Sequence, residues 1–93
     1  MIKIKDIEEL KREANYDNCQ TDIFEGCISL AGGSARSSKR IRYFTDDDSW
    51  EVYHEIDETE ECFDSTKQML NQTNIGLALE QGALFQYDYS RNV

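Results

Sequence analysis

The chain contains no proline, one histidine and three cysteines among its 93 residues. With neither proline nor a low-complexity stretch it has no recognisable linker, and folded domains run from about 50 to 250 residues, so we expect residues 1–93 to form a single domain. The cysteines, Cys19, Cys27 and Cys62, are odd in number and lack C-x-x-C spacing, which excludes a disulfide framework and a zinc motif. This cysteine usage favours a reducing compartment.

Long apolar runs and positive charge are also scarce. No apolar stretch approaches the roughly 18–20 residues of a membrane span, and the first residues lack the hydrophobic segment of a signal peptide, so we expect a soluble, cytoplasmic protein with no membrane partner. Ten Lys and Arg residues stand against nineteen Asp and Glu residues, for a net charge of −9. This balance disfavours direct binding to nucleic acid and indicates a basic protein partner.

The first two thirds of the chain show clear periodicity. Apolar residues at helical spacing predict a helix over residues 5–14. Alternating apolar residues predict strands over residues 23–30, 39–45 and 50–56. The aspartate-rich turn between the last two strands should join them as a hairpin.

The last third predicts shorter elements. Ser65 and Gln68 have the spacing of a capping box, which predicts a short helix there. Residues 74–81 can form a second short helix that Gly82 would close, and residues 83–89 alternate as a strand. Together the elements predict an α+β fold with an N-terminal helix, an antiparallel three- to four-stranded sheet and a short C-terminal helix.

The single histidine limits the catalytic options. His54 lies on the apolar face of the strand predicted over 50–56, as expected for a hydrogen-bonded core or edge histidine. A Cys–His catalytic pair would need Cys27 or Cys62 beside it, and nothing in the spacing places them there; we expect no catalytic residues and cysteines that serve mainly as small apolar groups. The aspartates at 46–48 lack the spacing of a calcium loop, so we expect neither metal nor cofactor.

A glycine-containing stretch over residues 31–40 leads into a strand, which excludes a phosphate-binding loop because such a loop leads into a helix. It predicts a mobile hairpin loop. Since Arg36, Lys39, Arg40 and Arg42 crowd into seven positions, a contact loop is the alternative: it could hold an anionic group of a partner or pair with this protein's own acidic residues.

The strongest signal is an acidic stretch of nineteen residues without Lys or Arg. It holds ten carboxylates: Asp46, Asp47, Asp48, Glu51, Glu55, Asp57, Glu58, Glu60, Glu61 and Asp64. A solvated face that maintains solubility is one interpretation. The other is a partner-binding surface, because so many like charges repel one another and are only partly screened at a Debye length of about 8 Å.

Strand geometry suggests how such a surface would be built. Glu51, Glu55 and Asp57 should form one row, with Tyr53 as an aromatic anchor among them. A DNA duplex carries one charge per about 1.7 Å of its axis. To imitate it, several rows or two protomers side by side would be needed, so a homodimer stays open.

In small size, strong acidity and α+β layout, the chain resembles the phage-encoded inhibitors of bacterial nucleases, including anti-CRISPR proteins that mimic DNA. It also resembles the acidic immunity proteins that neutralise nuclease toxins. The resemblance implies a non-enzymatic inhibitor in a bacterial host, whose acidic face sits in the groove that normally holds nucleic acid. A regulatory module that uses the Arg36–Arg42 segment is the other function that we consider.

Overall fold

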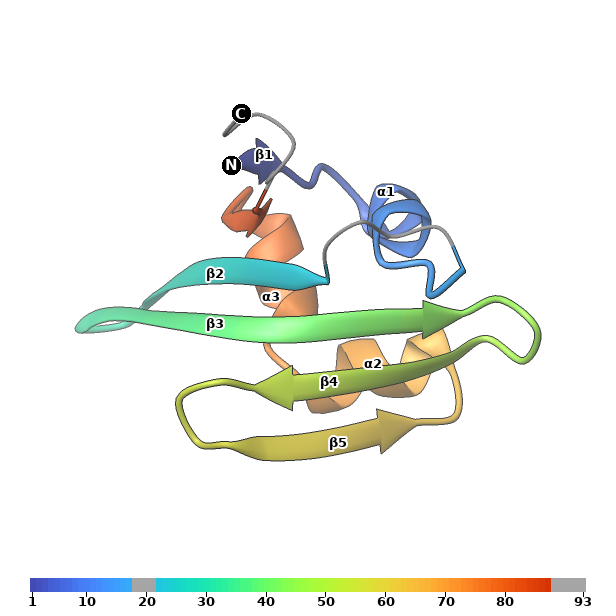
Figure 1. Cartoon of the computed structure of the whole chain (residues 1–93). Coiled ribbons are helices and arrows are strands. Elements are labelled where there is room, and N and C mark those ends of the chain that lie inside the picture. Colours follow the sequence, from blue (N-terminus) through green and yellow to red (C-terminus); the bar gives the residue numbers. More distant parts are fainter. Residues whose placement is uncertain (18–21, 88–93) are drawn as a thin grey trace.

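The computed structural model describes residues 1–17 and 22–87. Within these ranges the chain forms six strands and three short helices (Figure 1). In chain order they are β1 (Ile2–Lys3), α1 (Ile7–Glu13), β2 (Ile23–Leu30), β3 (Gly33–Phe44), β4 (Ser49–His54), β5 (Thr59–Phe63), α2 (Thr66–Gln72), α3 (Ile75–Glu80) and β6 (Leu84–Gln86). In the described part of the chain, no helix is long and apolar enough to cross a membrane.

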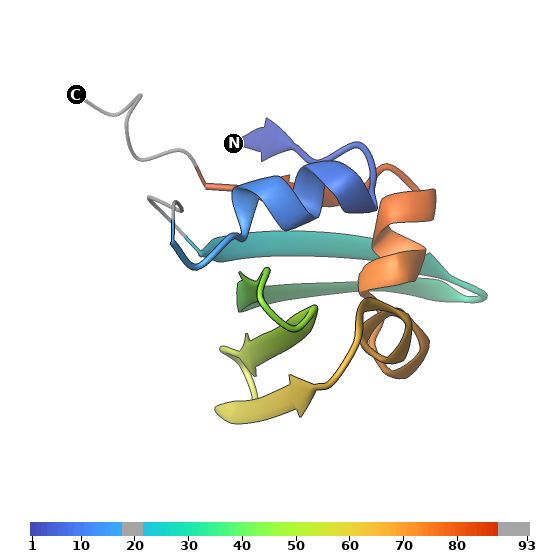
Figure 2. The ribbon, with the colours of Figure 1, turned by 90° about the vertical axis from the view of Figure 1, so that its right-hand side faces the viewer.

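The six strands form one antiparallel sheet in the order β1-β6-β2-β3-β4-β5. Helices α2 and α3 lie on the same side of this sheet (Figures 1 and 2), and α1 contributes to the same hydrophobic core. No helix of the described ranges covers the opposite face. The sheet therefore presents an open face to solvent.

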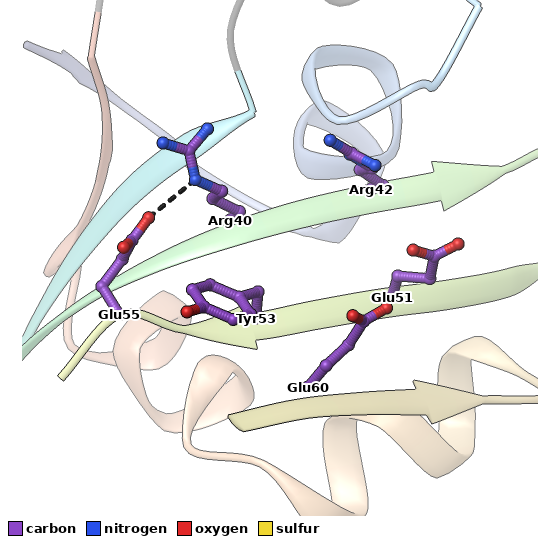
Figure 3. A pocket seen from close by; sticks show the side chains of 6 residues that line it. All are labelled: Arg40, Arg42, Glu51, Tyr53, Glu55 and Glu60. Atoms are coloured by element: carbon purple, nitrogen blue, oxygen red, sulfur yellow. Dashed lines mark hydrogen bonds and ion pairs between the residues drawn. The ribbon is translucent and has the colours of Figure 1, made fainter. Parts of the chain in front are cut away.

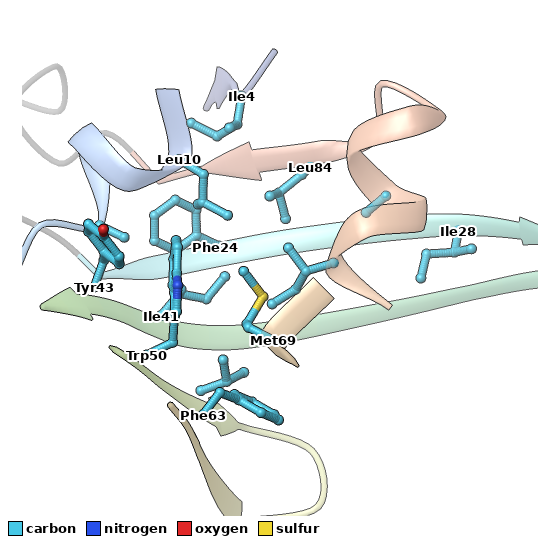
Figure 4. Packing of buried hydrophobic residues seen from close by; sticks show 14 residues of the cluster. Ile4, Leu10, Phe24, Ile28, Ile41, Tyr43, Trp50, Phe63, Met69 and Leu84 are labelled. Carbon is cyan, nitrogen blue, oxygen red and sulfur yellow. The ribbon is translucent and has the colours of Figure 1, made fainter. Parts of the chain in front are cut away.

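The hydrophobic core lies between the sheet and the helices (Figure 4). Trp50 of β4 and Phe24 of β2 are its largest fully buried side chains. The Trp50 ring lies 4.5 Å from the Tyr43 ring, centroid to centroid, and its Nε1 donates a hydrogen bond to Thr66 Oγ1 at 3.0 Å. Burial of each large side chain stabilises the fold by about 1.5–3 kcal/mol.

The predicted fold of an N-terminal helix and a three- to four-stranded sheet is wrong. The sheet has six strands, and strand β1 precedes the first helix. Strand β1 has only two residues and so carries no periodic pattern. Strand β5 is an edge strand in which Phe63 alone is buried, which leaves its acidic sequence without the apolar alternation that marks a strand.

The local helix signals are confirmed. The helix predicted over 5–14 is α1, and Asp6 caps it by accepting a backbone N–H of the first turn at 2.8 Å. Ser65 caps α2, since its Oγ accepts the backbone N–H of Gln68 at 3.1 Å. Gly82 follows α3 with a φ of 64°, the left-handed conformation that ends many helices.

The strand predictions hold in position but not in length. The strand expected over 39–45 is the end of the longer β3, and β4 stops at His54, which leaves Ile56 70% exposed in the following turn. The register of β3 with β4 confirms the hairpin through the aspartate turn. The last strand is β6; Asp88 and Tyr89, which were predicted to extend it, lie outside the described residues.

The prediction of a mobile loop over residues 31–40 is wrong. Strands β2 and β3 meet at a two-residue turn, Ala31 and Gly32, with Leu30 paired to Gly33. Gly32 has a φ of 86°, which favours glycine. Near this turn the residues of β2 and β3 are mostly exposed. This part of the sequence therefore lacks an apolar alternation and resembles a loop.

Candidate functional site

The open face of the sheet is hollowed into a groove of about 370 Å³. Its lining residues are Arg40 and Arg42 of β3, Glu51 and Tyr53 of β4, Glu55 just beyond β4, and Glu60 of β5 (Figure 3). They share this groove because side chains two residues apart on a strand project from the same face. The groove therefore sets two guanidinium groups against three carboxylates.

Both guanidinium groups of the groove are already bound within the sheet. Arg40 Nε donates to Glu55 Oε1 at 2.7 Å, and Arg40 Nη1 lies 3.5 Å from Asp22 Oδ1. Arg42 Nε donates to Asp22 Oδ2 at 2.8 Å, and this hydrogen bond raises the pKa of Arg42. The sequence analysis missed Asp22 as a shared counter-ion, because its position immediately before β2 gives no periodic signal.

The other two basic residues of the predicted contact loop lie apart. Arg36 Nε hydrogen-bonds to the carboxylate of Glu25, which also accepts the Tyr87 hydroxyl at 2.8 Å; the bonds from Arg36 and then Tyr87 lower the pKa of Glu25. Lys39 is buried. The Arg36–Arg42 segment is thus a strand whose arginines pair with the protein's own acidic residues.

The ten carboxylates of the acidic stretch occupy both turns and both faces of the β3–β5 region. The β3–β4 turn holds Asp46, Asp47 and Asp48; Glu51, Glu55 and Glu60 line the open groove; Asp57 and Glu58 lie in the β4–β5 turn; Glu61 lies opposite Val52 on the helix side; and Asp64 precedes α2. Among the described residues, only Asp48 and Glu55 pair with Lys or Arg. Eight carboxylates are therefore left without a Lys or Arg in ion-pair distance in this part of the chain, and one of them, Glu61, lies 3.8 Å from His54.

The expected row of Glu51, Glu55 and Asp57 is only partly correct. Glu51 and Glu55 line the open groove together with Tyr53. Asp57 lies in the β4–β5 turn, where strand alternation has ended, and lines a different cavity. Glu60 takes its place in the groove because β5 pairs with β4 and brings Glu60 opposite Tyr53.

Asp48 has a structural role within the acidic stretch. It accepts hydrogen bonds from the Tyr43 hydroxyl at 2.8 Å, from Thr66 Oγ1 at 2.6 Å and from the Thr66 backbone N–H at 3.0 Å. These bonds, those from Thr66 first, lower the pKa of Asp48 to about 2. Asp48 therefore ties the β3–β4 turn to the start of α2 and is not fully available to a partner.

The groove contains a pair of neighbouring carboxylates. Glu51 on β4 and Glu60 on β5 interact directly, and partial burial together with the hydrogen bond and charge of Glu60 raises the pKa of Glu51. Tyr53, half-buried, lies opposite Glu60 in the strand register. Two carboxylates that repel each other beside an aromatic ring form a site suited to a cation.

The sheet separates the remaining candidate catalytic groups. His54 lies opposite Lys39 on the helix side, whereas Cys62 pairs with Glu51, which lines the open groove. Cys27 and Cys62 are both exposed, which gives no support to the prediction that they serve mainly as small apolar groups. Cys19 lies outside the described residues. Within residues 1–17 and 22–87, no cluster of three or more His, Cys, Asp or Glu side chains could hold a metal ion.

Comparison of the chain with protein-family models, with curated proteins and with solved structures finds no match.

Proposed function

We propose that this protein is a non-enzymatic acidic inhibitor that occupies the basic, nucleic-acid-binding groove of a bacterial nuclease, as anti-CRISPR proteins that mimic DNA do, in the cytoplasm of a bacterial host. One observation carries the proposal. Eight carboxylates of the β3–β5 region have no Lys or Arg partner among the described residues, although the same sheet pairs its arginines closely with other carboxylates. If this surface only maintained solubility, ion pairs between these carboxylates and Lys or Arg would reduce the repulsion among them and stabilise the fold.

The arrangement of these charges suits a partner lined with Lys and Arg. Glu51 on β4 and Glu60 on β5 lie on adjacent strands, and neighbouring strands lie about 4.8 Å apart. The acidic turns extend the negative charge beyond both ends of β4. A partner's ammonium or guanidinium group placed between Glu51 and Glu60 would relieve their mutual repulsion, and Tyr53 beside them offers an aromatic contact.

The opposite choice, a module that contacts an anionic partner through Arg36, Arg40 and Arg42, gains no support. An incoming anion would have to displace Glu25, Glu55 or Asp22 from existing ion pairs. By contrast, Glu51 and Glu60 have no Lys or Arg within ion-pair distance among the described residues, although the charge of Arg42 acts on Glu51.

The test is affinity capture from a bacterial lysate, followed by nuclease assays on the captured protein. We expect a basic nuclease to bind, and its cleavage of DNA or RNA to fall when this protein is added. A double charge reversal, Glu51→Lys with Glu60→Lys, should abolish both effects. The matched control reverses two acidic residues outside the acidic stretch, Glu13→Lys with Glu80→Lys, and should retain them, since it changes the net charge equally.

Two results would overturn the proposal. One is capture of a nuclease whose activity is unaffected by this protein. The other is equal loss of binding in the control variant, because the distribution of charge would then be irrelevant and only the net charge would matter.

A further inference from the structure

A second cavity, of about 310 Å³, lies on the other side of the sheet from the groove. Its floor is formed by Ser37 and Lys39 of β3 and His54 of β4, and its walls by Asp57, Glu61 and the α2–α3 connection at residues 72–74. Small-molecule sites usually measure about 300–1,000 Å³. The cavity is therefore of a size that suits a small ligand.

Lys39 is the unusual residue of this cavity. It is only 4% exposed, and within the described chain its Nζ has one hydrogen-bond partner, Ser37 Oγ at 2.6 Å, and no carboxylate in ion-pair distance. Burial lowers the pKa of Lys39, because an ammonium group that loses water without gaining a counter-ion is destabilised. A ligand carboxylate would supply the missing counter-ion.

His54 provides a second group that lacks a partner. It lies directly opposite Lys39 in the β3–β4 register, and its Nε2 is buried with no hydrogen bond in the described structure. The nearest acidic atom, Glu61 Oε1, is 3.8 Å away, too far for a hydrogen bond. A buried polar atom without a partner costs about 1–3 kcal/mol, so both floor residues favour a polar ligand.

The sign of the charge changes between the floor and the mouth of the cavity. Lys39 lies at the floor, while Asp57 and Glu61 are exposed. A dianion such as phosphate would meet the repulsion of two carboxylates, and a simple cation would meet Lys39. Glu61 Oε1 lies 3.8 Å from His54 Nε2, so the acidic and basic groups of the cavity are close together. A ligand that carries a carboxylate and an ammonium group on the same carbon satisfies both.

We propose that this cavity binds a free amino acid, with its carboxylate on Lys39 and His54 and its ammonium group toward Asp57 and Glu61. This cavity lies on the opposite face of the sheet from the groove of Glu51 and Glu60, although Asp57 and Glu61 also belong to the acidic stretch. Binding there involves no covalent step. The polar connection at 72–74 forms the wall nearest the helices.

The experiment titrates the full-length ¹⁵N-labelled protein with an equimolar mixture of free L-amino acids and records amide NMR shifts. We expect one or more amino acids to shift the amides of Lys39, His54 and residues 72–74. Each binder is then compared with its N-acetyl derivative, which lacks the ammonium group, and with its amide, which lacks the carboxylate. Both derivatives should bind at least about tenfold more weakly.

Variants test the floor residue directly. Lys39→Met should reduce the affinity by at least about tenfold and should fold, because it removes a buried charge that has no counter-ion. Lys67→Met, at an exposed lysine of α2, is the matched control and should bind as the original chain does. His54→Phe, which fills the space of the imidazole but removes Nε2, gives a second variant that should also bind more weakly.

Three outcomes would overturn the proposal. The first is the absence of shifts at these amides with any amino acid at millimolar concentration. The second is an N-acetyl derivative that binds as well as its parent, which would make the cavity a site for simple anions. The third is unchanged binding by Lys39→Met.

Discussion

Replacement of Asp48 by Ala should destabilise the fold more than replacement of any other carboxylate of the acidic stretch by Ala. The carboxylate accepts three hydrogen bonds, from Tyr43 and twice from Thr66, and lies 3.8 Å from Lys11 Nζ. Asp48 also has a φ of 60°, a conformation that Asp tolerates better than Ala does. The substitution therefore removes the link between the β3–β4 turn and α2 while leaving backbone strain in place.

The size of the effect follows from these contacts. A hydrogen bond to a charged group contributes about 1.5–3 kcal/mol, but the Asp48 side chain is 44% exposed, so water replaces part of what is lost. The three bonds also share one acceptor group and do not add independently. We therefore expect Asp48→Ala to lower the free energy of unfolding by about 2–3 kcal/mol.

The pH dependence has a definite sign. The pKa of Asp48 is about 2 in the folded protein against an ordinary value of 3.8. Because the folded value is the lower one, the carboxylate stabilises the fold fully above the unfolded pKa, and this contribution is lost as the pH falls through about 2. The stability gap between the original chain and Asp48→Asn should therefore be largest near neutral pH and should narrow from about pH 4 downward.

Urea unfolding followed by the fluorescence of Trp50 measures all of these effects, since Trp50 Nε1 bonds to Thr66 in the same network. The control is Asp46→Ala in the same turn, where the exposed side chain makes no hydrogen bond within the described residues; it should change stability by no more than about 0.5 kcal/mol. Equal stability of Asp48→Ala and Asp46→Ala would refute the structural role assigned to Asp48.

Three further predictions follow from other features. Binding of the proposed nuclease partner should weaken and its association rate should fall as salt rises, as measured by surface plasmon resonance, because charged surfaces are screened. Cys62 should react with iodoacetamide more slowly than free cysteine at neutral pH, since partial burial and then the charges of Glu51, Glu60 and Asp64 raise its pKa; Glu51→Lys should speed the reaction. Gly82→Ala should cost about 1 kcal/mol in thermal or urea unfolding because of its positive φ, whereas Gly33→Ala, which meets no atom within 4 Å, should be neutral.

The elements that could be predicted from sequence are those with a buried face and a clear end. Helix α1, the strands β2 and β4, and the Ser65 cap of α2 satisfy this condition. Strand β5 does not satisfy this condition. It lies at the edge of the sheet, where pairing with β4 holds it in place although Phe63 is its one buried residue. The error in strand number came from the two edges of the sheet, β1 and β5, where backbone pairing needs no hydrophobic pattern.

The groove could be predicted in part. Strand alternation correctly separates Arg40 and Arg42 from the buried Ile41, and likewise separates Glu51 and Tyr53 from the core. Three features depend on tertiary contacts and could not be read from spacing. These are the shared counter-ion Asp22, the entry of Glu60 into the groove with β5, and the bonds between Asp48 and Thr66, eighteen residues apart.

The alternation of side chains along β3 and β4 places the groove on one face of the sheet and the cavity of Lys39 and His54 on the other. Lys39 and Arg40 are neighbours on β3, as Tyr53 and His54 are on β4, yet each pair divides between the buried cavity and the open groove. A shift of β4 by one residue against β3 would exchange the faces of Tyr53 and His54, because every side chain of β4 would change face. Insertion of a single residue that changed this register would therefore disturb both environments at once, whereas a two-residue shift would keep each side chain on its face. The length of the β3–β4 turn is thus under stricter constraint than the identity of its exposed residues.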